Sequence, residues 1–238
     1  MKLQAATQVA PNRWRQAARQ ALLALAPHRF VLASGPTTSA NVSLTFDDGP
    51  DPSATPRVLT ELRAAGVRAT FFLRGDRVAA HPDIVRQIHA EGHDIGHHSW
   101  SHSAPSTTSA ATLAAETART RELLRQTVGL DSRLFRPPHG KLSVGKAVRL
   151  AAMGQTIVLW TSDPGDRFQS SAAAMMAWVA AHPPRAGDII LLHDSAPVLA
   201  DALPALIEAV HARGLGFATV SEIGVAGRAR TRAVPLVA

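Results

Sequence analysis

The chain has no cysteine and no tyrosine among its 238 residues. Without cysteine there is no disulfide, no thiolate nucleophile and no cysteine-ligated zinc or iron–sulfur site, so histidine and carboxylate side chains must hold any metal. No apolar run approaches the roughly 20 residues of a membrane-spanning helix, so we expect no transmembrane segment. An apolar fraction of 46% with 18% charged residues excludes a disordered chain and a coiled coil.

Lysine is also scarce, and the only lysines are Lys2, Lys141 and Lys146. The net charge of +7 therefore comes almost entirely from arginine spread along the chain. Nucleic-acid binding would be better supported by a clustered basic stripe, so we expect no nucleic-acid partner. The one dense arginine cluster lies in residues 224–238, which we interpret as a solvated basic tail.

The first 40 residues differ from the rest of the chain and predict a helical leader. Asn12 to Ala26 has the pattern of an arginine-bearing amphipathic helix, which Pro27 ends. The apolar stretch from Ala21 to Ala26 is shorter than the roughly 7 to 15 residues of a secretory signal. This favours a cytoplasmic protein, with an extracytoplasmic location left open.

From residue 41 onward, short apolar runs alternate with helical patterns, which predicts an α/β fold with a parallel sheet and helices packed outside it. Both an open sheet and a barrel fit this alternation. The expected strands are Val42–Phe46, Ala69–Leu73, Thr156–Trp160, Ile189–Leu192 and Gly216–Val220. The expected helices are Pro56–Ala65, Pro82–Glu91, Thr112–Val128, Val144–Met153, Ala172–Ala181 and Ala200–Arg213. Ligands of such folds bind at the C-terminal ends of the strands, so polar clusters after strands are candidate sites.

Two adjacent carboxylates, Asp47 and Asp48, directly follow the first of these apolar runs. They could simply start a turn with Gly49 and Pro50, since these are turn residues. Two neighbouring like charges repel, however, and a bound cation would relieve the conflict. One carboxylate could then ligate the cation while the other acts as a base.

Four histidines crowd the segment from His93 to His102, which we expect to lie between regular elements. His98 and His102 are four residues apart, so on a helical turn both imidazoles would share one face and could share a metal. His93 and His97 have the same spacing, and spacing alone leaves both pairs open. Two histidines and one aspartate would leave a coordination position for water, the arrangement of a catalytic metal site.

Three further clusters are weaker when taken one at a time. The prolines and glycine of Arg136–Gly140 predict a rigid loop, in which Arg136 could hold a carboxylate and a backbone amide could face an oxyanion. Asp163 to Asp166 alone is an ordinary turn. His193 ends a strand of buried type, either as a structural histidine or as a general acid whose pKa a neighbouring aspartate sets.

Together these segments resemble the NodB-homology polysaccharide deacetylases, carbohydrate esterase family 4, over about residues 41–223. Thr45–Pro50 is similar to the first motif, TFDDGP, and His98–His102 to the second, H-[ST]-x-x-H. Arg136–Gly140, Asp163–Asp166 and Leu191–His193 resemble the third to fifth motifs. The resemblance implies that residues 41–223 form a catalytic domain, an irregular (β/α) barrel of about seven parallel strands with its site at the strand C-termini.

The resemblance also implies roles for the residues that match these motifs. Asp48, His98 and His102 would bind one divalent metal, zinc in the first place, with cobalt, nickel or manganese as alternatives. Asp47 would be the general base that activates water, and His193 the general acid that protonates the leaving amine. The implied reaction is N-deacetylation of N-acetylglucosamine-type sugars, giving a free amine and acetate.

Four more residues would support this chemistry if the resemblance holds. Arg136 would orient Asp47, and Asp166 would tune His193. The backbone amide of His139 would help to bind the oxyanion, and Leu191 would line the acetyl pocket. The substrate partner would be an N-acetylated carbohydrate such as chitooligosaccharide or peptidoglycan, and the sequence indicates no oligomeric state.

Two departures from the family pattern bear on the substrate. His139 replaces the usual tyrosine, and Arg167 stands where the family has a tryptophan that walls the substrate groove. A metal-dependent hydrolase of a non-sugar amide or imide on the same fold would keep every motif, so this alternative stays open. A catalytically silent sugar-binding module would have lost Asp47 or a histidine ligand, and neither is lost.

Overall fold

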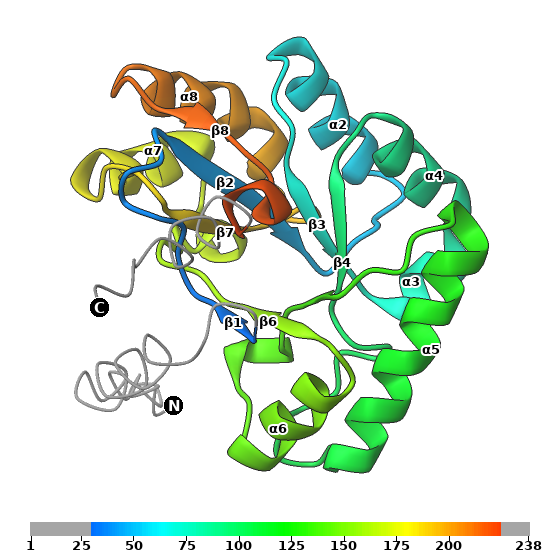
Figure 1. Cartoon of the computed structure of the whole chain (residues 1–238). Helices are drawn as coiled ribbons and strands as arrows, with labels where there is room; N and C mark the ends of the chain where they lie inside the picture. Colours follow the sequence, from blue (N-terminus) through cyan, green and yellow to red (C-terminus); the bar gives the residue numbers. More distant parts are fainter. Residues whose placement is uncertain (1–29, 225–238) are drawn as a thin grey trace, which may run out of the picture.

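The structure, a computed structural model, describes residues 30–224 (Figure 1). Strands and helices alternate along this part of the chain, and every strand pair is parallel. The strands are β1 (Val31–Leu32), β2 (Asn41–Asp47), β3 (Thr70–Leu73), β4 (Asp94–His97), β5 (Leu134–Phe135), β6 (Thr156–Val158), β7 (Ile189–His193) and β8 (Gly216–Phe217). The helices are α2 (Thr55–Ala64), α3 (Gly75–Ala80), α4 (Pro82–Ala90), α5 (Ala110–Val128), α6 (Val144–Ala152), α7 (Ala172–Ala181) and α8 (Leu199–His211), with short 3₁₀ helices at Pro138–Gly140 and Asp166–Phe168.

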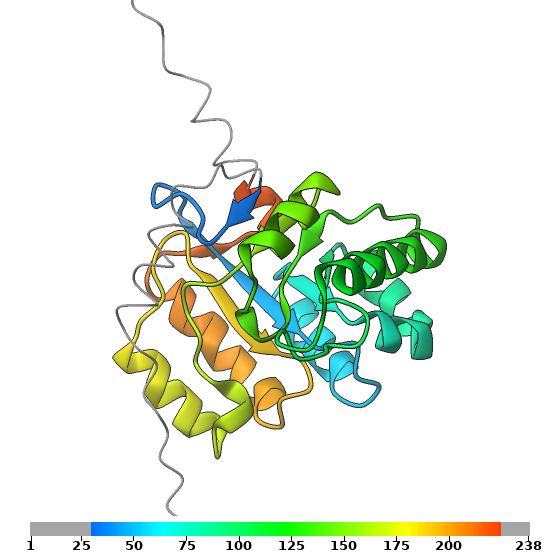
Figure 2. The ribbon, with the colours of Figure 1, turned by 90° about the horizontal axis from the view of Figure 1, so that it is seen from below.

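Seven strands form one continuous sheet in the order β1-β6-β5-β4-β3-β2-β7, and β8 pairs with β2 beside it. The predicted irregular barrel of about seven parallel strands is therefore confirmed. Figure 2 shows α7 and α8 on one side of the long strand β2 and α5 on the other. No helix within residues 30–224 has the length and apolar character needed to cross a lipid bilayer.

The barrel is closed only loosely between β7 and the segment that follows β6. The segment that follows β6 reaches β7 through a single parallel bridge between Ser162 and Ile190. The Thr161 amide donates to the Ile189 carbonyl at 3.0 Å, and the Leu191 amide donates to the Ser162 carbonyl at 2.9 Å. We call this contact between residues 161–163 and β7 the seam.

Strand β2 explains why polar side chains point into the barrel. Successive side chains of a strand face opposite sides, so Leu44 and Phe46 pack into the core beneath the helices. Thr45 and Asp47 face the other way and meet a side chain from the far side of the barrel. The alternation thus separates an apolar outer layer from a polar interior at the end of the strand.

Most predicted elements lie within a few residues of the observed ones, and helix Ala172–Ala181 has the predicted bounds. The histidine-rich segment, however, was wrongly expected between elements, because Asp94–His97 forms strand β4. Val31 and Leu32, inside the predicted leader of residues 1–40, form strand β1 and pair with β6. The expected helix Asn12–Ala26 and residues 225–238 of the expected tail lie outside the described residues.

Candidate active site

All five polar clusters of the sequence lie at the C-terminal ends of strands. Asp47 ends β2, and His193 ends β7. His98 follows β4 directly, Arg136 follows β5, and the Asp163–Asp166 segment comes after β6. The parallel register pairs Asp47 with His193, so residues far apart in the sequence become neighbours. This edge of the barrel is therefore the candidate active site.

Asp48, His98 and His102 form the one group of metal-ligand type found within residues 30–224, and their ligand atoms lie within 4.8 Å of one another. Asp48 Oδ1 is 3.4 Å from His102 Nε2 and 3.8 Å from His98 Nε2. Asp48 Oδ1 is buried and has no hydrogen-bond partner among the described residues. The Nδ1 atom of His98 lies 2.7 Å from the Arg136 carbonyl, which leaves Nε2 facing Asp48. A divalent metal fits this donor set and would satisfy the unpartnered oxygen.

His98 and His102 do not lie on a helical turn. Ser99 and His102 both have left-handed backbones, with φ of 60° and 55°, and the segment between them is a bent loop. The His102 amide donates to Ser99 Oγ at 3.1 Å, which stabilises the loop. The two imidazoles converge because the loop turns back on itself, and the spacing of four residues coincides with helical spacing without a helix.

Each ring of the other histidine pair has one hydrogen-bonding contact within the fold. His93 Nδ1 accepts a hydrogen bond from the Ala69 amide at 3.1 Å. His97 is fully buried, with Nε2 2.8 Å from the Gln155 side chain. Burial lowers the pKa of His97 to about 4, so its ring is neutral at ordinary pH. Among the described residues, His98 and His102, and not His93 and His97, therefore lie with Asp48 in a group of metal-ligand type.

Asp47 is held by a fully buried arginine, Arg136. Arg136 Nη1 donates to Asp47 Oδ1 at 2.8 Å and to Thr45 Oγ1 at 2.7 Å, and Nη2 donates to the Leu159 carbonyl at 3.2 Å. The guanidinium also lies over the Phe72 ring, 4.1 Å from its centroid. Because a buried charge needs a partner, Arg136 is paired with Asp47, and this contact fixes the direction of the Asp47 carboxyl group.

His193 is oriented by Asp166. Its Nδ1 lies 2.9 Å from Asp166 Oδ1, and its backbone amide donates to Asp166 Oδ2 at 2.6 Å. Burial alone would lower the pKa of His193, but the hydrogen bond and charge of Asp166, with the charges of Asp47 and Asp48, raise it above its usual value. The imidazole can therefore carry a proton close to neutral pH.

Arg167 contacts a candidate metal ligand, Asp48, and no motif of the sequence predicts this contact. Its Nη1 lies 2.8 Å from Asp48 Oδ2, and its side chain is 47% exposed. Burial alone would raise the pKa of Asp48, but the positive charges of His98, His102, His193 and Arg167 lower it below its usual value. Arg167 occupies one Asp48 oxygen and leaves the other to the histidines. No local pattern signals this contact, because it joins residues 119 positions apart.

His139 and Leu191 also reach this edge. The His139 ring centroid is 4.5 Å from that of His102, and its backbone is left-handed with φ of 56°. A Cβ on the next residue, Gly140, would lie 2.4 Å from the Trp160 ring, so only glycine fits this bend. Leu191 is two residues before His193 on β7, so it shares the face of that histidine, and it is 5% exposed.

A further buried carboxylate, Asp194, lies beneath the loop that carries Asp48. It accepts a hydrogen bond from Thr55 Oγ1, whose oxygen in turn accepts one from the Asp51 amide at 2.7 Å. A Cβ on Gly49 would lie 2.0 Å from Asp194 Oδ2, so this carboxylate packs directly against the Gly49 backbone. Burial raises the pKa of Asp194 to about 7. The sequence places it beside His193, but only the fold turns it under the Asp48 loop.

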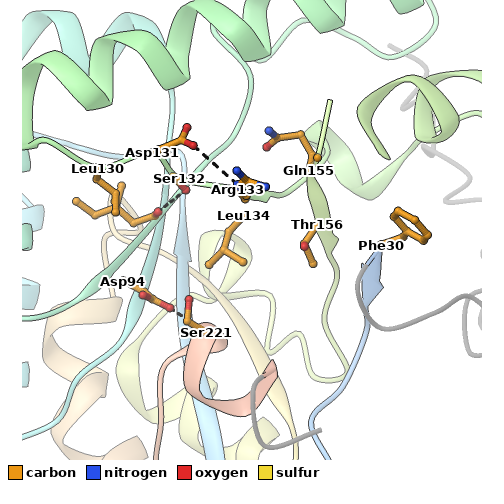
Figure 3. A pocket seen from close by; sticks show the side chains of 12 residues that line it. Phe30, Asp94, Leu130, Asp131, Ser132, Arg133, Leu134, Gln155, Thr156 and Ser221 are labelled. Atoms are coloured by element: carbon orange, nitrogen blue, oxygen red, sulfur yellow. Dashed lines mark hydrogen bonds and ion pairs between the residues drawn. The ribbon is translucent and has the colours of Figure 1, made fainter. Parts of the chain in front are cut away.

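A cavity of about 440 Å³ lies at the opposite end of the barrel, around the N-terminal ends of β4, β5 and β6 (Figure 3). Its polar groups already have partners. Ser132 Oγ donates to the Ile95 carbonyl at 2.6 Å, and the Ser221 amide donates to Asp94 Oδ2 at 2.8 Å. No candidate catalytic or metal-binding residue lines this cavity.

Comparison with known proteins finds consistent similarities. The sequence profile of the polysaccharide deacetylases matches residues 34–158. A peptidoglycan-N-acetylglucosamine deacetylase of Bacillus cereus is 34% identical over 208 residues, which cover 84% of this chain and 95% of that relative. The peptidoglycan-N-acetylmuramic acid deacetylase PdaC of Bacillus subtilis is 32% identical over 184 residues, covering 76% of this chain and 38% of that relative.

A solved structure shows the same architecture. The crystal structure of the Bc1960 peptidoglycan N-acetylglucosamine deacetylase, in complex with 4-naphthalen-1-yl-N-oxidanyl-benzamide, matches with a TM-score of 0.78 at 32% identity. The match covers 82% of this chain and 92% of that chain.

Proposed function

The chain belongs to the polysaccharide deacetylase family, which hydrolyses the amide C–N bond of N-acetyl sugars, and from this premise we propose that it is a metal-dependent N-deacetylase of N-acetylglucosamine-type sugars. Its products would be a free amine and acetate. The observation that carries the proposal is the juxtaposition, at one edge of the barrel, of the Asp48, His98 and His102 cluster with an arginine-held carboxylate and an aspartate-held histidine.

Asp48, His98 and His102 would hold the metal, and zinc suits their nitrogen and oxygen donors, with cobalt, nickel and manganese as alternatives. When bound, the ion would polarise the amide carbonyl and lower the pKa of water. Arg167, on the outer oxygen of Asp48, would keep that carboxylate turned toward the histidines.

Asp47 is the proposed general base. Its Oδ2 lies 3.7 Å from His98 Nε2, so a water molecule beside the histidines would be within its reach. Arg136 holds the other oxygen of Asp47 at 2.8 Å and fixes the direction in which the free oxygen points. Asp47 would take the proton of the attacking water as the C–O bond forms.

His193 is the proposed general acid, on the other side of the cluster. Its raised pKa favours the protonated ring, and Asp166 fixes Nδ1 so that Nε2 is the atom left to donate. Nε2 would give its proton to the amide nitrogen as the C–N bond breaks. The base and the acid thus have opposite protonation states at the working pH.

Two further residues would act on the acetyl group. The backbone amide of His139 would donate to the oxyanion, and Leu191 would contact the acetyl methyl. The substitution of histidine for the family's tyrosine leaves this amide in place. The names of the relatives support peptidoglycan as one candidate substrate class, alongside chitooligosaccharide.

The test is acetate release from N-acetylglucosamine oligomers by purified protein, with and without added zinc, beside Asp47→Asn. Metal-dependent release that the variant loses would support the deacetylase. Binding of one metal per chain without acetate release would favour the alternative, hydrolysis of a non-sugar amide or imide. Failure to bind a metal would overturn the assignment of Asp48, His98 and His102.

A further inference from the structure

A cavity of about 300 Å³ lies at the seam of the barrel. The segment after β6 lines one side of it, and the last turn of α7 with the loop leading into β7 lines the other. A single bridge between Ser162 and Ile190 joins the two sides here, and the neighbouring strands of the sheet except β4 and β5 are joined by two or more residue pairs. The incomplete closure of the barrel therefore leaves room for a ligand. The side chains that matter below are Thr161, Asp163, Trp178, His182, Arg185 and Asp188.

Two aromatic rings form part of the cavity wall. The Trp178 and His182 rings are stacked, with centroids 4.4 Å apart and an interplanar angle of 20°. Trp178 packs against the hydrophobic core, while His182 is exposed, and its Nδ1 lies 3.1 Å from the Trp178 carbonyl. The core thus supports one ring of a rigid pair, and the pair offers a flat surface at the cavity.

The charged groups of the cavity are of both signs, and Asp188 is held in place by hydrogen bonds. Asp188 accepts hydrogen bonds from Thr161 Oγ1 and from the Arg185 amide, both at 2.7 Å. The Arg185 guanidinium forms no ion pair within residues 30–224 and is exposed. The positive charge of Arg185 partly offsets the negative charges of Asp163 and Asp188. The cavity therefore has little net charge, which disfavours binding of a phosphate or another strong anion. Carboxylates, a hydroxyl and a guanidinium together suit the hydroxyl groups of an uncharged ligand.

The cavity is connected to the catalytic cluster along the chain, through the segment that carries Asp163 and Asp166. Asp163 is exposed, but partial desolvation of its carboxyl raises its pKa, and the charges of His193, Asp166 and Asp47 act on it as well. Asp163 also lines the cavity and precedes Asp166 by three residues. A polymer with one unit at His193 could therefore extend a later unit toward Trp178.

We propose that this cavity is a secondary glycan-binding subsite, in which an uncharged pyranose packs its C–H face on the Trp178–His182 pair while its hydroxyls reach Asp163, Asp188 and Arg185. The proposal rests on the proposed function, because the pyranose belongs to the chain whose N-acetyl group is hydrolysed. An aromatic surface with a few oriented polar groups is the general form of such a site.

The test compares acetate release from the N-acetylglucosamine dimer and hexamer by wild type, His182→Ala and Trp178→Ala. Loss of the stacking surface should raise KM for the hexamer by about three- to tenfold and leave kcat and the dimer unchanged. His89→Ala, which removes an exposed histidine from the end of α4, is the matched control and should leave both substrates unaffected.

Either an equal effect on dimer and hexamer or no effect on either would overturn the subsite. His182→Ala changes an exposed side chain, so it tests the proposal even where Trp178→Ala fails to fold. Calorimetric binding of the hexamer separates the two proposals. If the protein releases no acetate but binds the hexamer in a His182-dependent way, the proposed function fails and the subsite stands. If it releases acetate from both substrates with unchanged KM in His182→Ala, the subsite alone fails.

Discussion

At the C-terminal ends of the strands, charged side chains converge around Asp48 Oδ1, a buried oxygen without a hydrogen-bond partner among the described residues, whereas at the N-terminal ends Ser132 and Asp94, which line the large cavity, are bonded to nearby backbone. Asp48 Oδ1 lies between two imidazoles at 3.4 and 3.8 Å, while Ser132 and Asp94 have close backbone partners. Yet the N-terminal end holds the cavity of about 440 Å³ (Figure 3). Convergence of side chains of metal-ligand type, rather than volume, distinguishes the candidate active site.

Removing a candidate metal ligand, at the C-terminal ends of the strands, should cause the largest loss of activity. His102→Ala would remove one of three donors, and we expect metal content to fall from one ion per chain toward none, with acetate release lost by about a thousandfold or more. Elemental analysis measures the metal content, and the acetate assay measures the loss of activity. Chelation of wild type should cause the same loss and added zinc should reverse it; full activity in the metal-free protein would contradict the assignment.

Loss of the proposed base should have the next largest effect. Asp47→Asn should lower kcat by about a hundred- to ten-thousandfold, because the amide cannot accept the proton from water. Asp94→Asn, at the N-terminal end, is the matched control and should keep activity within about twofold. Comparable losses of kcat in the two variants would show that the ends do not differ as the geometry indicates.

The pH profile of kcat/KM should be bell-shaped, with a basic limb set by His193. The pKa of His193 is raised, chiefly by Asp166 against the effect of burial, and the ring must be protonated to donate. Asp166→Asn removes that charge, so the pKa should fall and the basic limb should move to lower pH. A limb that stays in place in Asp166→Asn would rule out His193 as the group that sets it.

The smallest expected effect concerns stability and comes from Asp194. Burial raises the pKa of its carboxyl from 3.8 to about 7, so the folded protein binds its proton more tightly than the unfolded chain. The stability that this neutral group contributes is present at low pH and is lost as pH rises through about 4 to 7.

The side chain of Asp194→Asn cannot ionise. Between pH 5 and 8 the unfolding free energy of this variant should therefore rise relative to that of wild type, by on the order of a few kcal/mol. Urea denaturation at several pH values measures the difference. Asp131→Asn, an exposed carboxylate at the other end of the barrel, should show no such gain. Parallel curves for wild type and Asp194→Asn would mean that Asp194 is ionised in the folded protein throughout this range.

Long periodic segments and motif residues could be predicted from the sequence because their signals are local. Helix Ala172–Ala181 is expected from its helical pattern between apolar runs, and in the structure Ser171 caps it. Asp47, Asp48 and His193 follow from polar residues that end apolar runs. Strands β1 and β5 have two residues each, too few for any alternation to be visible, and their pairing partners define them.

The sequence by itself determined which residues are available for chemistry: paired aspartates, a histidine cluster, and no cysteine. Tertiary structure decided which histidines meet Asp48, that Arg167 covers its outer oxygen, and that Asp194 lies beneath Gly49. These contacts join segments 50 or more positions apart, with Asp48 and Arg167 separated by 119. The register of parallel strands brings such segments together, and no local pattern of side chains encodes that register.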